Sequence, residues 1–198
     1  MIVGAVITAA GKSSRMGAFK PLLPIGGVPA AQRLISSIYE AGIDNIVLVT
    51  GNRAEELENS LRHMNVTFLR NDMYEHNEMF DSIRIGVGHL KTQCNKILIS
   101  PVDVPLFTVE TVKTLLKSNA SIAIPTYDNK PGHPVAIGGR AIFEILEYSG
   151  NGGLRCAIAD LSLDIENIIV NDCGILYDMD TQEDYAAIVK MQQSANRL

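Results

Sequence analysis

The chain has 198 residues, of which 46% are hydrophobic and 20% are charged, and its formal net charge is −5. This size and composition suit one globular domain, residues 1–198, and exclude a disordered or fibrous protein. The negative charge argues against a nucleic-acid partner, and no stretch approaches the roughly 18 apolar residues of a membrane span. Three widely spaced cysteines argue against a disulfide framework and favour a reducing, cytoplasmic location.

Short apolar segments alternate with longer segments of helical period up to about residue 126. The predicted strands cover residues 2–8, 45–50, 66–70, 96–100 and 121–126. The predicted helices between them cover residues 29–42, 53–64, 81–91 and 108–118. This alternation predicts an α/β fold of three layers (α/β/α), in which helices cover both faces of an open, mostly parallel sheet.

The rhythm changes after residue 126, where the last third of the chain is expected to decorate the sheet. A strand is predicted at 133–139, a helix at 140–149, a flexible turn at 150–153, a short helix at 154–161, a strand at 165–170 and a helix at 181–194. Thr181 is placed to cap the last helix, with Asp184 reaching back to it.

The loop after the first strand combines small residues at 9–11 with three cations, Lys12, Arg15 and Lys20, and no acid occurs before residue 40. The small residues leave backbone N–H groups open to an anion. Arg15 offers a planar fork for phosphate oxygens, and Lys20 offers a mobile point charge. Neither the Walker A pattern nor G-x-G-x-x-G is present, which disfavours a Rossmann dehydrogenase. The loop predicts a site for a small polyanion, and a solvated glycine loop is the alternative.

Carboxylates follow at two places. Asp103 leaves the end of a strand between two prolines, and beside bound phosphates a lone carboxylate indicates Mg²⁺. The alternative is an Asp that caps the turn or the next helix. Asp178 and Asp180 alternate along an extended segment, so both are expected to point the same way. One of them is a candidate second metal ligand, and the alternative is a pair of helix-start acids.

Three loops leave strand ends, at 9–24, 71–80 and 101–107, and we expect them to converge on one crevice. Ser82 opens the predicted third helix, where it either caps the helix or faces this crevice. His133, between Gly132 and Pro134, indicates a backbone shaped to meet a substrate, although a lone histidine is more often structural. Arg155 closes the glycine-rich turn, which either holds an anion or is a plain turn.

Five short motifs make the chain similar to a known family. The pattern A-[AG]-G-x-S-x-R-M-G-x-x-K occurs at 9–20, M-x-x-S-[IL] at 79–83, D-x-P at 103–105, G-H-P-V at 132–135 and D-x-D-T-x-x-D at 178–184. Together they resemble the molybdenum cofactor cytidylyltransferase group, among nucleotidyltransferases of glycosyltransferase-A-like fold. The start Thr8-Ala9-Ala10-Gly11 is similar to that of cytidylyl-transferring members, whereas guanylyl-transferring members have Leu-Ala-Gly-Gly.

The resemblance implies that CMP is transferred from CTP to a phosphate-bearing acceptor, foremost the molybdopterin cofactor, with release of pyrophosphate. It implies Mg²⁺, with Mn²⁺ as the alternative ion, held by Asp103 and Asp180, with Asp178 in reserve. Arg15, Lys20 and Asp103 are the implied catalytic residues, and His133 and Arg155 the implied acceptor-binding residues. The implied nucleotide-binding residues are Thr8, Ala9, Ala10, Gly11, Ser13, Arg15, Met16, Gly17, Lys20 and Ser82.

Two departures from the family pattern concern the acceptor. Val104 stands where many cytidylyltransferases have Gln, and residues 150–155 replace a G-D-x-G-A-R motif. The alternatives are therefore cytidylyl or guanylyl transfer to another acceptor, such as a sugar phosphate or phosphocholine, and a non-catalytic nucleotide-binding assembly factor. The implied protein partner is a molybdoenzyme or its maturation chaperone.

Overall fold

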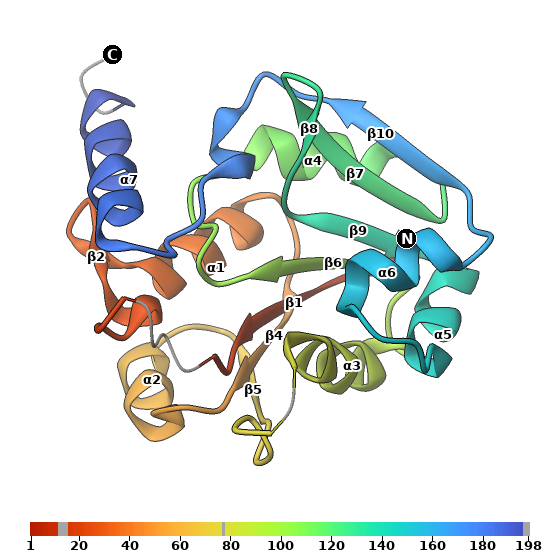
Figure 1. Ribbon diagram of the computed structural model, residues 1–198, viewed down its shortest axis with the longest axis horizontal. Helices are drawn as coiled ribbons and strands as arrows, with labels where there is room; N and C mark the ends of the chain where they lie inside the picture. Colours follow the sequence, from red (N-terminus) through yellow and green to blue (C-terminus); the bar gives the residue numbers. More distant parts are fainter. Residues whose placement is uncertain (12–15, 77, 196–198) are drawn as a thin grey trace.

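The computed structural model describes residues 1–11, 16–76 and 78–195 (Figure 1). Its main sheet has the strand order β10-β7-β9-β6-β1-β4-β5, and a short strand, β8, pairs with β7. The strands are β1 (Val3–Ala9), β4 (Asn45–Thr50), β5 (Thr67–Arg70), β6 (Lys96–Pro101), β7 (Ile122–Tyr127), β8 (Lys130–Pro131), β9 (Val135–Gly138) and β10 (Ile165–Ile169). Along the main path only β9 pairs antiparallel to its neighbours, so the predicted mostly parallel sheet is confirmed.

Helices cover both faces of this sheet, which confirms the three-layer prediction. One hydrophobic cluster contains side chains of α1 (Ala30–Glu40), α2 (Ala54–Leu61) and α4 (Val109–Lys117). A second cluster contains side chains of α3 (Met79–Leu90), α5 (Arg140–Glu147) and α6 (Gly153–Asp160). Within the described residues, no helix combines the length and the apolar character needed to cross a membrane.

The central strands separate the two clusters because their side chains alternate between the faces of the sheet. In β1, Ala5 and Ile7 belong to the first cluster and Val6 to the second. Strand β4 divides in the same way, with Leu48 on one face and Val47 on the other. Burial on both faces explains why these strands read as unbroken apolar runs in the sequence.

A third, smaller cluster joins segments from the two ends of the chain. The hairpin of β2 (Pro24–Ile25) and β3 (Val28–Pro29) follows the short 3₁₀ helix η1 (Lys20–Leu22). Its Ile25 packs with Ile188 of the last helix, α7 (Gln182–Ala195), and the Tyr185 hydroxyl donates a hydrogen bond to the Pro24 carbonyl at 2.6 Å. The last helix therefore anchors the segment before it close to η1.

Helix α3 begins at Met79, two residues before the predicted start, and lies directly on β1. A Cβ atom added at Gly86 would come within 2.4 Å of Val6 Cγ1, whereas one added at Gly88 would meet nothing closer than 4.0 Å. Close packing of the helix on the strand therefore requires glycine at 86 but not at 88.

Gly86→Ala is expected to lower the free energy of unfolding by about 1–3 kcal/mol, because the core has no room for the added methyl group. Gly88→Ala, on the same helix, is expected to raise it by about 0.5–1 kcal/mol, because alanine costs less backbone entropy in a helix. Urea denaturation of the two variants measures both effects. Equal stabilities would contradict the close contact between α3 and β1.

Candidate functional site

The three predicted loops converge at the carboxyl ends of the parallel strands. They line a cavity of ≈ 160 Å³, which we call the first cavity. Its lining residues are Thr8, Ala9, Ala10, Gly11, Lys20, Pro21, Asn71, Tyr74, Glu78, Met79, Ser82, Pro101, Val102 and Asp103. The register explains the meeting of two of the loops, because Thr8 of β1 lies opposite Pro101 of β6 and its carbonyl accepts from the Val102 N–H at 3.0 Å.

Most of the predicted nucleotide-binding residues line this cavity. Space is open above Gly11, since a Cβ atom there would meet nothing within 4 Å. Met16 is buried and Gly17 has a φ of 65°, and neither lines the cavity. Two further predicted residues, Ser13 and Arg15, lie outside the described residues.

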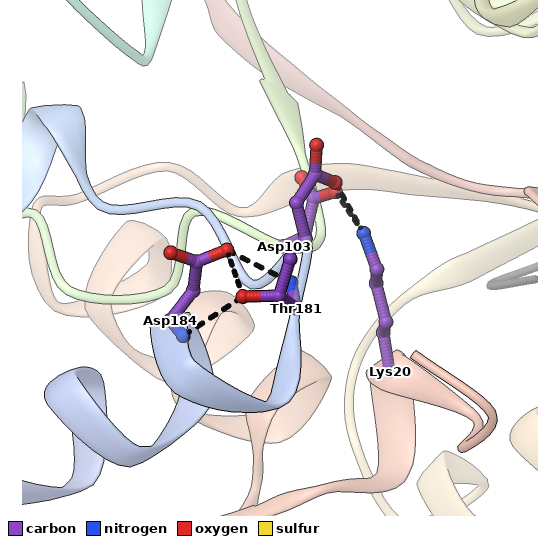
Figure 2. Close-up of polar contacts among 5 residues, drawn as sticks. Lys20, Asp103, Thr181 and Asp184 are labelled. Carbon is purple, nitrogen blue, oxygen red and sulfur yellow. Dashed lines mark hydrogen bonds and ion pairs between the residues drawn. The ribbon is translucent and has the colours of Figure 1, made fainter. Parts of the chain in front are cut away.

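Lys20 joins the first loop to two carboxylates (Figure 2). Its Nζ lies 2.7 Å from Asp180 Oδ1 and 3.2 Å from Asp103 Oδ2. Burial alone would lower the pKa of Lys20, but hydrogen bonds and charge attraction from the two aspartates outweigh it, so the pKa is raised. The ammonium therefore bridges two carboxylates that are far from it in the sequence.

Backbone contacts hold Asp103 and Asp180 together independently of Lys20. The Met179 N–H donates to the Asp103 carbonyl at 2.9 Å, which brings the segment before α7 onto the turn after β6. Thr181 caps α7, because its hydroxyl accepts from the Asp184 N–H at 3.1 Å and its own N–H donates to Asp184 Oδ2 at 2.8 Å (Figure 2). The predicted capping arrangement is thus confirmed, and it fixes the backbone next to Asp180.

One alternative for Asp103 is wrong. Asp103 does not cap α4, whose N-cap is Thr108, with a hydroxyl that accepts from the Thr111 N–H at 3.2 Å. Asp180 stands two residues before the first residue of α7, as the helix-start alternative expects, and its carboxylate also contacts Lys20.

Asp178 differs from its neighbour in environment. Its side chain is largely exposed. Loss of water around the part that is covered raises its pKa, and so do the negative charges of Asp180 and Asp103. Among residues 1–11, 16–76 and 78–195, no group of three or more His, Cys, Asp or Glu side chains is arranged to hold a metal ion. The pair Asp103 and Asp180 therefore provides the better candidate ligands, and two carboxylates suffice for Mg²⁺.

The predicted acceptor-binding residues lie in a second cavity of ≈ 830 Å³. Its walls are largely apolar, with Phe80, Ile83, Ile99, Ile124, Val135, Leu154 and Ile158, and they include His133 and Arg155. The second cavity shares four lining residues with the first: Thr8, Glu78, Met79 and Pro101. The two cavities therefore adjoin at the ends of β1 and β6.

His133 reaches this edge because β9 is antiparallel. Val135 of β9 lies opposite Ile99 of β6, so the residues before β9 lie beside the carboxyl end of β6. The His133 N–H donates to the Ile175 carbonyl at 3.0 Å, and a Cβ atom on Gly132 would lie 2.4 Å from that oxygen. Glycine at 132 is therefore required for this close approach.

The imidazole of His133 has an unusual environment. Nδ1 is buried and has no hydrogen-bond partner among the described residues. Burial lowers the pKa of His133, against a smaller opposing effect of the Asp103 charge. A neutral ring with an unpaired buried nitrogen is suited to accept from, or donate to, a polar group of a bound molecule.

The lowered pKa gives a test in solution. Below about pH 6.5, the unfolded chain binds a proton at His133 before the folded protein does, so the free energy of unfolding falls as the pH falls. This loss is expected to reach up to about 1 kcal/mol per pH unit, and His133→Asn should remove it. Urea denaturation at pH 7.5 and 5.5 measures the difference, with His63→Asn, at an exposed site, as the control. Equal pH sensitivity of all three proteins would contradict the burial of this ring.

Several cavity residues were not singled out from the sequence. The Asn71 side chain donates from Nδ2 to Ser82 Oγ at 3.0 Å, and Tyr74 packs against Gly51 behind the first loop. Asn71 follows the end of β5, so its position at a strand end was the available signal. The alternative interpretation of Ser82 as a helix cap is wrong, because Glu78 is the N-cap of α3, and the Glu78 N–H donates to Asp81 Oδ2 at 2.9 Å.

The sequence of the chain matches one protein family and is similar to a known enzyme. The model of the family described as the MobA-like NTP transferase domain matches residues 5–165. The molybdenum cofactor cytidylyltransferase of Escherichia coli is 26% identical over 186 residues, which are 92% of this chain and 93% of the relative.

Two solved structures share the fold. A nucleotidyl transferase from Methanothermobacter thermautotrophicus superposes with a TM-score of 0.86 and 24% identity, over 98% of this chain and 99% of the other. Rv0371c of Mycobacterium tuberculosis, solved in complex with manganese, gives a TM-score of 0.79 and 20% identity, over 96% and 99% of the two chains. The nucleotidyltransferase fold expected from the motifs is confirmed.

Proposed function

Since this chain belongs to the MobA-like NTP transferase family, and is therefore a nucleotidyltransferase, we propose that it transfers CMP from CTP to a phosphate-bearing acceptor and releases pyrophosphate. The favoured acceptor is the molybdopterin cofactor. The observation that carries the proposal is the pair of adjoining cavities, one bordered by Lys20 and Asp103 and the other by His133 and Arg155.

The first cavity is assigned to the nucleotide. Its volume is small for a whole nucleotide, so CTP would extend from it along the loop after β1. The backbone of residues 9–11 and the ammonium of Lys20 would bind the triphosphate and the leaving pyrophosphate. Arg15 is assigned to the same phosphates from its place in the loop motif.

Asp103 and Asp180 are assigned to Mg²⁺, with Mn²⁺ as the alternative ion. The residues fit a cation, because an oxygen of each carboxylate already contacts one positive charge, the Lys20 ammonium. When bound, the metal would neutralise charge on the triphosphate. Asp178 is the weaker candidate, because it is exposed, whereas the Lys20 ammonium contacts Asp103 and Asp180.

The chemistry proposed for the acceptor requires little proton transfer. The second pKa of a phosphate monoester is about 6, so its oxygen is already a nucleophile near pH 7. This oxygen would attack the α-phosphorus while the bond to pyrophosphate breaks. The protein would then act by aligning the two phosphates across the shared wall and by stabilising negative charge.

The second cavity is assigned to the acceptor. Arg155 would bind the acceptor phosphate, and the apolar walls suit an acceptor whose remaining part is compact and weakly charged. His133 would contact a polar group of that part through its unpaired nitrogen. A reducing cytoplasm suits the three free cysteines, and a molybdoenzyme or its chaperone is the proposed recipient of the product.

A matrix of nucleotides against acceptors tests the proposal. CTP, GTP, ATP and UTP are each incubated with Mg²⁺ and with molybdopterin cofactor, a sugar 1-phosphate or phosphocholine, and pyrophosphate release is followed. We expect release only with CTP and the molybdopterin cofactor. Release with another pair would replace the substrate assignment, and nucleotide binding without release from any pair would favour a non-catalytic nucleotide-binding protein.

A further inference from the structure

The Lys20 ammonium lies where the proposed metal ligands would place a cation. Its Nζ is within 3.2 Å of one carboxylate oxygen of each aspartate, and the side chain is only 12% exposed. A divalent ion that bridged the same two oxygens would compete with the ammonium for their negative charge and would be repelled by it. Metal binding at Asp103 and Asp180 is therefore opposed while Lys20 stays in place.

The Lys20 side chain can move into the first cavity, because Lys20 also lines that cavity and its four-carbon stem is flexible. Its backbone is held in place, since the Leu23 N–H donates to the Lys20 carbonyl at 3.1 Å. A triphosphate in the first cavity would offer the ammonium new anionic partners. The stem can then turn while the chain around it stays in place.

The carboxylate pair is held in position without Lys20. The Met179 N–H bonds the Asp103 carbonyl, and the Thr181 and Asp184 cap fixes the backbone next to Asp180. Removal of the ammonium would take away the positive charge that now contacts one oxygen each of Asp103 and Asp180. Those two oxygens would then be open to a divalent cation.

We propose that Lys20 occupies the divalent-metal site of the nucleotide-free protein, and that metal binds well only when a nucleotide triphosphate draws Lys20 away. This rests on the proposed function in assigning the metal to Asp103 and Asp180. If Lys20 blocks the site for about nine-tenths of the time, metal binding is weakened about tenfold. By linkage, nucleotide then strengthens metal binding by the same factor that metal strengthens nucleotide binding.

The test measures the affinity of the protein for Mn²⁺ with no nucleotide present, using the electron paramagnetic resonance signal of the free ion. Lys20→Met is expected to bind Mn²⁺ at least about tenfold more tightly than the wild type. Lys91→Met is the control, because it removes the same charge from an exposed residue at the C-terminal end of α3, about 18 Å of helix away from the site. Adding Asp180→Asn to Lys20→Met should abolish the gain.

Mn²⁺ affinity of Lys20→Met equal to or weaker than that of the wild type would overturn the proposal. Lys20→Gln is prepared in parallel, and circular dichroism checks both folds. Loss of the fold in both variants, unrelieved by Mn²⁺, would also overturn it, because the carboxylate pair must persist without the ammonium. Tight Mn²⁺ binding by Lys20→Met together with no pyrophosphate release by the wild type would uphold this inference and refute the proposed transfer reaction.

Discussion

Asp103→Asn is expected to lower kcat for pyrophosphate release on the order of 10²–10³-fold, with the substrates that the nucleotide and acceptor matrix identifies. Asparagine keeps the shape and one oxygen of the side chain but loses the negative charge that would hold the metal on the triphosphate. The turn itself should survive, because Asp103 contributes its backbone carbonyl to Met179. The measurement is a steady-state assay at saturating CTP and acceptor.

A matched control for this variant is Asp44→Asn. Asp44 is exposed and precedes the amino end of β4, so it lies at the edge of the sheet opposite the site. It loses the same charge and should keep wild-type turnover. Near-normal kcat in Asp103→Asn, or an equal loss in both variants, would count against the metal-holding role of Asp103.

Lys20→Met is expected to lower kcat by a similar factor, on the order of 10²–10³, because one positive contact to the leaving pyrophosphate is lost. The Lys20→Met variant is therefore expected to bind Mn²⁺ more tightly, as proposed above, while its turnover falls. Measuring kcat and KM for CTP separately tests the assignment, since a contact made mainly in the transition state changes kcat.

Lys91→Met again serves as the control and should turn over CTP as the wild type does. A rise in KM for CTP with unchanged kcat would mean that Lys20 contributes only ground-state binding. Normal values of both constants would remove Lys20 from the phosphate site altogether.

The alternation of strands and helices was readable from the sequence because the central strands are apolar on both faces. Ala5, Val6 and Ile7 are all buried, so the pattern of a parallel sheet core appears directly in the chain. The convergence of three loops followed from this architecture alone, since parallel strands end at one edge.

Other features depend on contacts that a linear pattern does not contain. The two-residue strands β2, β3 and β8 are too short to carry a period. The antiparallel insertion of β9 between β6 and β7 decides that His133 lies at the edge of the site, and a four-residue strand carries no sign of its direction. The predicted start of a helix was also imprecise, as at α3, which begins two residues earlier than predicted. The Asp81 carboxylate accepts from the Glu78 N–H and so caps the first turn of this helix.

The pairing of Lys20 with both aspartates was the least predictable feature. Each residue was selected from its own motif, and separate partners were expected, phosphate for Lys20 and metal for Asp103 and Asp180. Their contact spans 160 positions of sequence between Lys20 and Asp180. It arises because the last helix packs on the β2–β3 hairpin, which no local pattern records.

The packing of α7 on this hairpin also makes the site depend on both ends of the chain. Asp180 precedes α7, whose Ile188 packs on Ile25 of the hairpin next to η1. A substitution that loosened this contact would displace the Asp180 carboxylate from Lys20 while strands β1, β4 and β6 kept their pairing. Damage at a distant apolar contact would then appear as a loss of activity in a protein whose sheet is still folded.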